Sequence, residues 1–277
     1  MSRRLKAAGW VLLGFGALYL TVWGVWSRFE RMPKRYLDNA EQKLLAGDYL
    51  GAVRDYEKIT EEYSNSRIVP EAHYWIGVID HLYLNKPQKA IESFQKTIQA
   101  ANAAGRDRVL AARKYIAEIY EKKLNKPREA IAEYEKIIQE SPHPEQALES
   151  QYEVGELYFN LGDLAQARAE WDLLVKKDPK SRLAPAALYR EGSTYFVAGN
   201  CKEALPFYQR LLSDYPEKET SHYYAKFDMA NCLEEGQKPA EALRLYKELE
   251  GLYPNKELLA SKIRRLEQSR PGAKEES

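Results

Sequence analysis

The sequence predicts an all-α fold: a right-handed α-solenoid of about six helical hairpins with a C-terminal capping helix, preceded by one transmembrane helix. Three observations lead to this prediction. An alanine is followed four residues later by an aromatic residue six times, at intervals of 37 to 40 residues. A proline stands twelve residues after four of these alanines. A stretch of apolar and uncharged residues lies near the N-terminus. The six pairs are Ala52/Tyr56, Ala90/Phe94, Ala130/Tyr134, Ala167/Trp171, Ala204/Tyr208 and Ala242/Tyr246.

The uncharged run, residues 7–26, follows a short basic tail, residues 1–6, and precedes a linker, residues 27–33. As a helix it would span about 30 Å, the thickness of a bilayer's hydrocarbon core, and tryptophans lie near both ends, as in aromatic belts. A cleaved signal peptide would have a shorter apolar core and a small-residue cleavage site. A lipoprotein would have a cysteine at its processing site, and a buried core helix would rarely run directly into a basic cluster. We therefore expect an uncleaved transmembrane anchor.

The numbers of Lys and Arg residues on the two sides of this anchor are nearly equal, so charge alone does not decide its orientation. A short basic tail resists crossing the membrane, whereas a long domain crosses largely regardless of its charge. We therefore expect the N-terminus in the cytoplasm and the body outside it. The opposite orientation, with the body facing the cytoplasm, remains the alternative.

Each Ala-x-x-x-aromatic pair is predicted to lie on helix B, the second helix of a hairpin, where a spacing of four places both residues on one face. Another small residue lies 12 or 13 positions earlier, on helix A. The two small residues let the helices pack closely. These earlier residues are Ala40, Gly77, Ala117, Gly155, Gly192 and Ala230. The predicted units are residues 34–65, 66–103, 104–142, 143–179, 180–216 and 217–254.

The turn between the two helices of a hairpin has its own signals. A Gly-Asp or Gly-Asn pair, such as Gly162-Asp163 or Gly199-Asn200, can end one helix in the left-handed conformation and cap the next. After the last unit we expect an amphipathic capping helix, residues 255–269, of the kind that such arrays need. Residues 270–277 should form a disordered tail.

This pattern resembles the tetratricopeptide repeat (TPR) over residues 34–254, because the two small residues, the aromatic residue and the closing proline match its consensus positions. The period is longer than the usual ~34 residues, and a bulky residue, such as Leu174, stands three positions after the aromatic one. These departures are similar to the bacterial envelope group that includes the repeat lipoprotein of outer-membrane assembly and the Tol-Pal cell-division coordinator. The resemblance implies a periplasmic scaffold on the inner (cytoplasmic) membrane.

Composition and motifs argue against several functions. The chain has 42 basic and 41 acidic residues, so the body lacks the uncompensated positive charge that nucleic-acid binding needs. The four histidines have no metal-ligand spacing, no glycine-rich phosphate loop occurs, and no serine has the context of a nucleophile elbow. We therefore expect no catalytic residues, no metal, no cofactor and no small-molecule substrate.

The candidate partner-binding residues lie on helix A, which lines the concave groove in tetratricopeptide arrays. They stand three positions before, one position after or four positions after the small residue of helix A. An aromatic groove dotted with carboxylates would suit a peptide with apolar and basic side chains. The alternative is that these rings are ordinary packing between helices. The candidates are Tyr74, Glu118, Tyr152, Glu156, Phe159, Tyr189, Ser193, Phe196, Phe227 and Asn231.

Two interpretations remain open for the two cysteines of the chain. Cys201 lies at the turn of the fifth hairpin and Cys232 near the end of helix A of the sixth. In an oxidising compartment they could form a disulfide. If their Cα atoms are more than about 7 Å apart, they are two separate thiols.

Taken together, the sequence predicts a membrane-anchored scaffold that docks segments of partner proteins in its concave groove on the periplasmic side. One alternative is the same scaffold facing the cytoplasm as part of a membrane complex. A less favoured one is an envelope hydrolase on an α-solenoid, which would need converging catalytic carboxylates.

Overall fold

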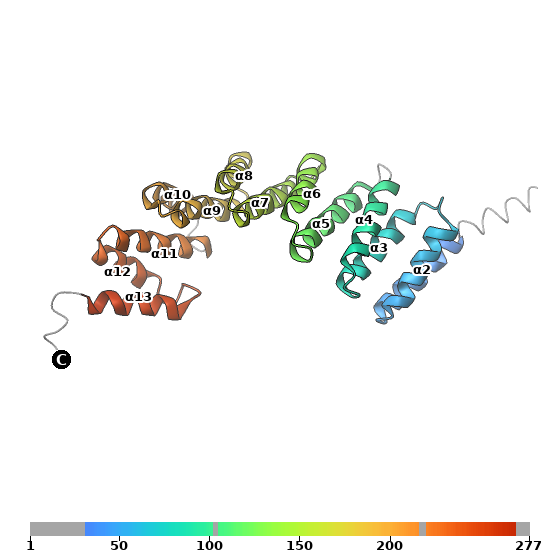
Figure 1. Cartoon of the computed structure of the whole chain (residues 1–277), viewed down its shortest axis with the longest axis horizontal. Coiled ribbons are helices and arrows are strands. Elements are labelled where there is room, and N and C mark those ends of the chain that lie inside the picture. The colour runs from blue at the N-terminus through green and yellow to red at the C-terminus, as the bar shows by residue number, and fades with distance from the viewer. Residues whose placement is uncertain (1–30, 102–104, 216–219, 270–277) are drawn as a thin grey trace, which may run out of the picture. The chain divides into compact units, whose positions relative to one another are not determined.

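The computed structural model describes residues 31–101, 105–215 and 220–269, and these ranges form an all-α array of helical hairpins, as predicted (Figure 1). Residues 31–45 are helical. The helix of residues 31–45 and α2 form the first hairpin, and each later hairpin consists of the next two helices along the chain. These helices are α2 (Tyr49–Glu62), α3 (Val69–Leu82), α4 (Pro87–Ala100), α5 (Arg106–Lys122), α6 (Pro127–Glu140), α7 (Pro144–Asn160), α8 (Leu164–Lys177), α9 (Ala184–Val197), α10 (Cys201–Asp214), α11 (Thr220–Glu235) and α12 (Pro239–Glu248), and α13 (Lys256–Gln268) follows the last hairpin.

The predicted anchor at residues 7–26 and the tails at residues 1–6 and 270–277 lie outside the described residues. Within the described ranges, none of the helices has the length and apolar character needed to cross a membrane. The first described helix already includes residues 31–33, which the sequence places in the linker.

The chain divides into two compact units, an N-terminal unit of residues 1–133 and a C-terminal unit of residues 134–277. In the N-terminal unit, α3 packs against α2, α4 and α5. In the C-terminal unit, α9 packs against α8, α10 and α11, and α12 packs against α11 and α13. Within each unit these helices therefore pack against the next helices along the chain, as expected of a repeat array.

The six alanine–aromatic pairs form the core, which confirms their predicted structural role. All six alanines are fully buried, and the aromatic residues are at most 3% exposed. The small residues of helix A make room for these rings. A Cβ atom on Gly155 would lie 2.4 Å from the Trp171 ring, and one on Gly192 would lie 2.5 Å from the Tyr208 ring. A larger side chain at either position would push helix A away from helix B.

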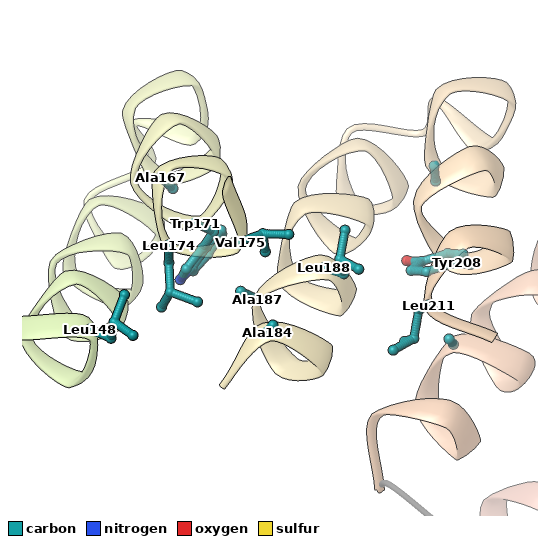
Figure 2. Close-up of a cluster of buried hydrophobic side chains, with 12 residues drawn as sticks. Leu148, Ala167, Trp171, Leu174, Val175, Ala184, Ala187, Leu188, Tyr208 and Leu211 are labelled. Atoms are coloured by element: carbon teal, nitrogen blue, oxygen red, sulfur yellow. The ribbon is translucent and has the colours of Figure 1, made fainter. Parts of the chain in front are cut away.

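Figure 2 shows how one such core continues from hairpin to hairpin in the C-terminal unit. Trp171 on α8 and Leu188 on α9 are fully buried, and Tyr208 on α10 closes the cluster. Burial of such side chains contributes roughly 1.5–3 kcal/mol each. The cluster thus holds α7 to α10 as one packed body, and so fixes where the opposite face of each helix A points.

The turns follow the predicted chemistry at most positions. Gly162 has φ +80°, and the Asp163 carboxylate accepts a hydrogen bond from the Gln166 backbone N–H at 3.2 Å. Asn200 was expected to cap α10 in the same way, but its side chain makes no capping hydrogen bond. Its backbone carbonyl accepts from the Ala204 N–H at 3.1 Å, as the Asp163 carbonyl does from the Ala167 N–H, so α10 lacks only the side-chain cap.

The capping helix α13 packs its apolar side on the last hairpin. Leu259, Ile263 and Leu266 are buried in a cluster with Tyr246 and Tyr253. The opposite side of α13 is exposed and charged. The helix therefore covers the apolar end of the array with a soluble surface.

Candidate functional site

The ten candidate residues lie on five A helices. We call the eight in the C-terminal unit the candidate binding face, and two more lie on equivalent positions of α3 and α5 in the N-terminal unit. The candidate binding face consists of Tyr152, Glu156 and Phe159 on α7, Tyr189, Ser193 and Phe196 on α9, and Phe227 and Asn231 on α11. Most of these side chains are half-buried, whereas Ser193 and Phe227 are buried.

An ion pair joins α7 to α9 on this face. The Arg190 guanidinium donates to the Glu156 carboxylate at 2.6 Å. The same guanidinium lies over the Phe159 ring, 5.8 Å from its centre. The Tyr152 ring lies on the same helix, and burial raises the pKa of its hydroxyl. The carboxylate that was expected to meet a basic partner is thus already neutralised by an arginine of this chain.

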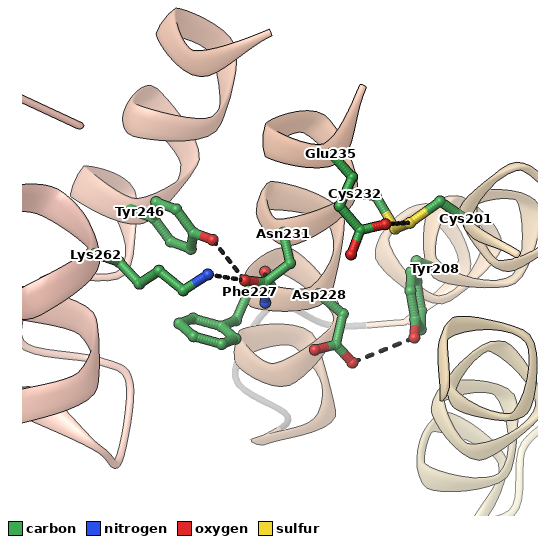
Figure 3. Close-up of a disulfide and its surroundings, with 9 residues drawn as sticks. All are labelled: Cys201, Tyr208, Phe227, Asp228, Asn231, Cys232, Glu235, Tyr246 and Lys262. Atoms are coloured by element: carbon green, nitrogen blue, oxygen red, sulfur yellow. Dashed lines mark hydrogen bonds between the residues drawn. A yellow bond between two sulfur atoms is a disulfide. The ribbon is translucent and has the colours of Figure 1, made fainter. Parts of the chain in front are cut away.

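A buried carboxylate joins α9 and α10 to α11. Asp228 is 8% exposed and accepts a hydrogen bond from the Tyr189 hydroxyl at 3.1 Å. It accepts a second one from the Tyr208 hydroxyl at 3.2 Å (Figure 3). Burial raises the pKa of Asp228 to about 6, although the two phenol donors act in the opposite direction. The Tyr189 ring is therefore held in place by its hydroxyl, which leaves its orientation on the face fixed.

Asn231 lies on α11 and is covered by side chains of helices further along the chain. Its side-chain oxygen accepts from the Tyr246 hydroxyl at 2.8 Å and also from the Lys262 ammonium (Figure 3). Lys262 and Arg265 of α13 both pair with the neighbouring Glu234. Polar groups at the C-terminal end of the face are therefore satisfied within the chain by the capping helix.

Phe227 belongs to the core, so for this residue the packing interpretation applies. It is 6% exposed and stacks on the Tyr253 ring at 4.4 Å. Ser193 on α9 is also buried, at 6% exposed. By contrast, Phe159 and Phe196 are half-buried and only border the core cluster. The accessible part of the face is therefore formed by α7 and α9.

In the N-terminal unit, Tyr74 and Glu118 lie on α3 and α5. Tyr74 contacts the rings of Phe94 at 5.8 Å and Tyr115 at 6.2 Å, and Glu118 lies near His81, whose pKa burial lowers and the Glu118 charge raises. Aromatic packing joins these two A helices at this level, and an ion pair at 3.1 Å between Arg108 of α5 and Glu71 of α3 joins them elsewhere.

Sequence reasoning did not identify Arg190 and Asp228 as members of the site. Both stand two positions before the small residue of helix A, and each contacts the A helix of the preceding hairpin. Tyr115 occupies the same position on α5 and contacts α3. The position two residues before the small residue of helix A can be read from the sequence. In these three helices, the residue at that position contacts the preceding helix A.

The cysteines are joined by a disulfide between the first residue of α10 and the last turns of α11 (Figure 3). Their Cα atoms lie 5.5 Å apart, within the range that a disulfide spans. Of the two interpretations left open, the structure has the bonded one. The packing of α11 against α10 brings the two positions together.

Within the described ranges, no group of His, Cys, Asp and Glu side chains could hold a metal ion. Among the buried carboxylates, Asp228 faces two phenols, whereas Asp55 and Asp80 pair with lysines. The candidate binding face thus consists of aromatic rings held by packing, next to charged groups that are paired within the chain. Such a surface is suited to contact with another protein chain.

The tetratricopeptide repeat family matches residues 120–182, 152–219 and 189–257. No protein of curated function matches the chain in sequence. Among solved structures, a tetratricopeptide repeat protein from Parabacteroides merdae is 16% identical with a TM-score of 0.56, and the alignment covers 86% of each chain. The MamA protein is 20% identical with a TM-score of 0.51, covering 69% of this chain and 95% of its own. PilW, a type IV pilus biogenesis factor, is 18% identical with a TM-score of 0.50, covering 83% and 97%.

These structural likenesses concern the fold, since all three identities are below 25%. The family match covers three overlapping windows that together span residues 120–257, and the last four alanine–aromatic pairs lie inside them. The chain therefore carries tetratricopeptide repeats over residues 120–257, and it is a scaffold for protein–protein interactions of a kind that is generally not enzymatic.

Proposed function

We propose that this protein is a membrane-anchored scaffold of the bacterial cell envelope, and that it docks segments of partner proteins on the candidate binding face, on the periplasmic side. The observation that carries the proposal is the repeated, half-buried placement of rings on successive A helices, with Tyr152 and Phe159 on α7 and Tyr189 and Phe196 on α9. Their backs are packed against the core, so binding would cost little side-chain ordering.

The charges of the face favour apolar contact with the partner. Arg190 already compensates Glu156, so a basic partner side chain would have to displace an existing pair. Rigid rings with neutral surroundings instead favour an extended or helical segment with apolar side chains. The partner segment is therefore proposed to be apolar at the residues that face α7 and α9.

The disulfide supports the periplasmic orientation. Disulfides persist in oxidising compartments and are rare in the cytoplasm, where thiols are kept reduced. The Cys201–Cys232 bond joins two helices that are otherwise neighbours in the array. Such a bond would be reduced in a body facing the cytoplasm. The predicted anchor would then concentrate the body at the membrane surface and so raise its effective concentration toward membrane partners.

The face is tested by replacing Phe159 and Phe196 with Ser in the full chain and repeating a crosslinking pull-down from envelope membranes. The expected result is loss of the specific partners. Leu173→Ser is the matched control, since Leu173 is 54% exposed on α8, away from the A helices, and it should retain them. If the double variant keeps the same partners as the control, docking on this face is wrong.

The orientation is tested with the variant Leu173→Cys. The native cysteines are bonded, so the introduced thiol is the reactive one. An impermeant maleimide added to cells with a permeabilised outer membrane should label it. Labelling that appears only after the inner membrane is lysed would favour the cytoplasm-facing alternative and overturn the proposed side.

A further inference from the structure

The turns of the first two hairpins expose large apolar side chains in the N-terminal unit. Leu45 is 89% exposed and Leu50 54% at the first turn, and Leu82 is 53% and Tyr83 49% exposed at the second. The Tyr49 and Tyr83 rings stack at 4.2 Å, which joins the two turns into one surface. Exposed apolar groups gathered in this way mark a contact with another molecule or with a membrane.

Basic residues continue this surface across the second and third turns. The third turn lies near the second, because α3, which ends at the second turn, contacts α5, which ends at the third. We call residues 44–51, 82–89 and 122–129 together the hairpin-turn edge. Its two acidic residues are engaged locally: the Asp48 carboxylate caps α2, and Glu129 pairs with Lys126. Its basic residues are Lys86, Lys89, Lys122, Lys123, Lys126 and Arg128.

The equivalent turns of the C-terminal unit have the opposite character. Residues 159–166, 196–203 and 234–241, aligned on the same alanines, carry five acidic and two basic residues, against two acidic and six basic on the hairpin-turn edge. Their exposed large apolar residues are single, with Leu161 at one turn and Val197 at another. The repeat fold therefore does not require apolar and basic turns, and those of the N-terminal unit need another explanation.

The position of the predicted anchor limits what can lie against this edge. Residues 31–45 are helical and extend about 21 Å. The five residue steps from the end of the predicted anchor at residue 26 to residue 31 reach at most about 17 Å. With the predicted anchor in the bilayer, residue 31 lies close to the membrane, and this reach allows residues 31–45 to tilt back so that Leu45 meets the membrane surface.

We propose that the hairpin-turn edge of the N-terminal unit rests on the surface of an anionic bilayer. Leu45, Leu82 and Tyr83 enter the boundary between headgroups and acyl chains, and the lysines of the second and third turns face lipid phosphates. Apolar and aromatic side chains flanked by lysines are the composition of interfacial membrane contacts, and anionic lipids attract each basic residue near the surface. The contact rests on the proposed membrane anchoring, and it would leave the C-terminal unit free for partners.

The test uses the full chain in nanodiscs that contain brominated lipids, either purely zwitterionic or with phosphatidylglycerol. An environment-sensitive fluorescent amino acid replaces Leu45 or Leu82, and in matched control variants it replaces Leu161 or Val197. These positions are exposed, so the probe disturbs no core. We expect the probe at Leu45 and Leu82 to lose most of its fluorescence to bromine quenching in anionic discs and less in zwitterionic ones. At Leu161 and Val197 we expect no quenching.

Replacing Lys86, Lys122 and Lys123 with Gln should restore the fluorescence of the probe at Leu45. Equal fluorescence at all four probe positions, in chains that remain in the discs, would overturn the membrane contact while leaving the anchor intact. Chains that do not stay in the discs would instead overturn the anchoring in the proposed function. Fluorescence changes that follow protein concentration, and not lipid, would assign the edge to a second copy of the chain and refute the lipid assignment.

Discussion

The two units are built from the same hairpin, but they differ in the residue that stands two positions before the small residue of helix A. In the C-terminal unit the residue two positions before the small residue makes a polar link, with Arg190 to Glu156 and Asp228 to Tyr189. In the N-terminal unit the equivalent Tyr115 packs as a ring. The C-terminal unit also carries the disulfide, whereas the N-terminal unit has the apolar and basic turns. The repeat thus fixes where each side chain lies on its helix, and the residues at the few positions that the core does not constrain determine what each unit can contact.

The largest expected effect tests whether the two cores are equivalent. Phe94 in the N-terminal unit and Trp171 in the C-terminal unit are both fully buried. We expect Phe94→Ala and Trp171→Ala each to lower the stability of its own unit by about 3–5 kcal/mol, the usual cost of such cavities. Hydrogen exchange resolved by peptide would show which unit is loosened. A change smaller than about 1 kcal/mol in one of them would mean that the cores are not equivalent.

A smaller effect isolates the disulfide. Cys201 and Cys232 are 31 residues apart in the sequence, and closing a loop of this length is expected to stabilise the fold by about 3–4 kcal/mol. Cys201→Ser/Cys232→Ser should lower the melting temperature and speed hydrogen exchange in α10 to α12, while the N-terminal unit stays unchanged. Reducing agent should have this effect on the native chain and none on the variant. Equal loosening of both units would contradict this assignment.

The two units are also expected to respond oppositely to mild acid. Burial raises the pKa of Glu191 to about 8, with Asp172 adding to the rise, and burial raises that of Asp228 to about 6. A carboxyl whose pKa is higher in the folded state stabilises the fold fully below its unfolded pKa, and this is lost as the pH rises through the folded value. The C-terminal unit should therefore gain about 2 kcal/mol from Glu191 between about pH 8 and pH 6.

In the N-terminal unit, burial lowers the pKa of His73 and His81. The contribution of these two histidines to the stability of the unit is present above the ordinary pKa of histidine, and it is lost as the pH falls below that value. Asp80 has a raised pKa, and it acts in the other direction at lower pH. Unit-resolved hydrogen exchange at about pH 8 and pH 6 measures the contrast. Glu191→Gln should remove most of the gain in the C-terminal unit, and an unchanged gain would show that Glu191 is not its source.

The smallest effect concerns the polar link itself. The Arg190 and Glu156 side chains are 33% and 20% exposed, so their coupling should be near the upper end for surface pairs, about 0.5–1 kcal/mol. A double-mutant cycle with Arg190→Gln and Glu156→Gln measures it by urea denaturation. Raising the salt concentration should reduce the coupling. A coupling of zero would leave the polar links without an energetic role and weaken the contrast between the units.

Much of the fold could be predicted because its signals are local. The Gly192 to Tyr208 contact reflects residues on two helices of one hairpin, and the spacing of small and aromatic residues places both helices. The left-handed glycine at Gly162 and the cap at Asp163 are likewise decided within a few residues. The candidate binding face was predicted less well. Phe227 was placed on it because of its register, yet Tyr253 from the next connection covers its ring.

The sequence by itself determined the repeat, the burial of the alanine–aromatic pairs and the side of each helix A that is turned away from its partner helix, because these depend on spacing along one or two helices. Only the tertiary structure decided which of those side chains stay accessible. Glu156 meets Arg190 from the following hairpin, and Cys201 comes to Cys232 at a Cα separation of 5.5 Å. Such contacts join residues some thirty positions apart, and they depend on the angle between neighbouring hairpins, which packing sets and residue spacing does not.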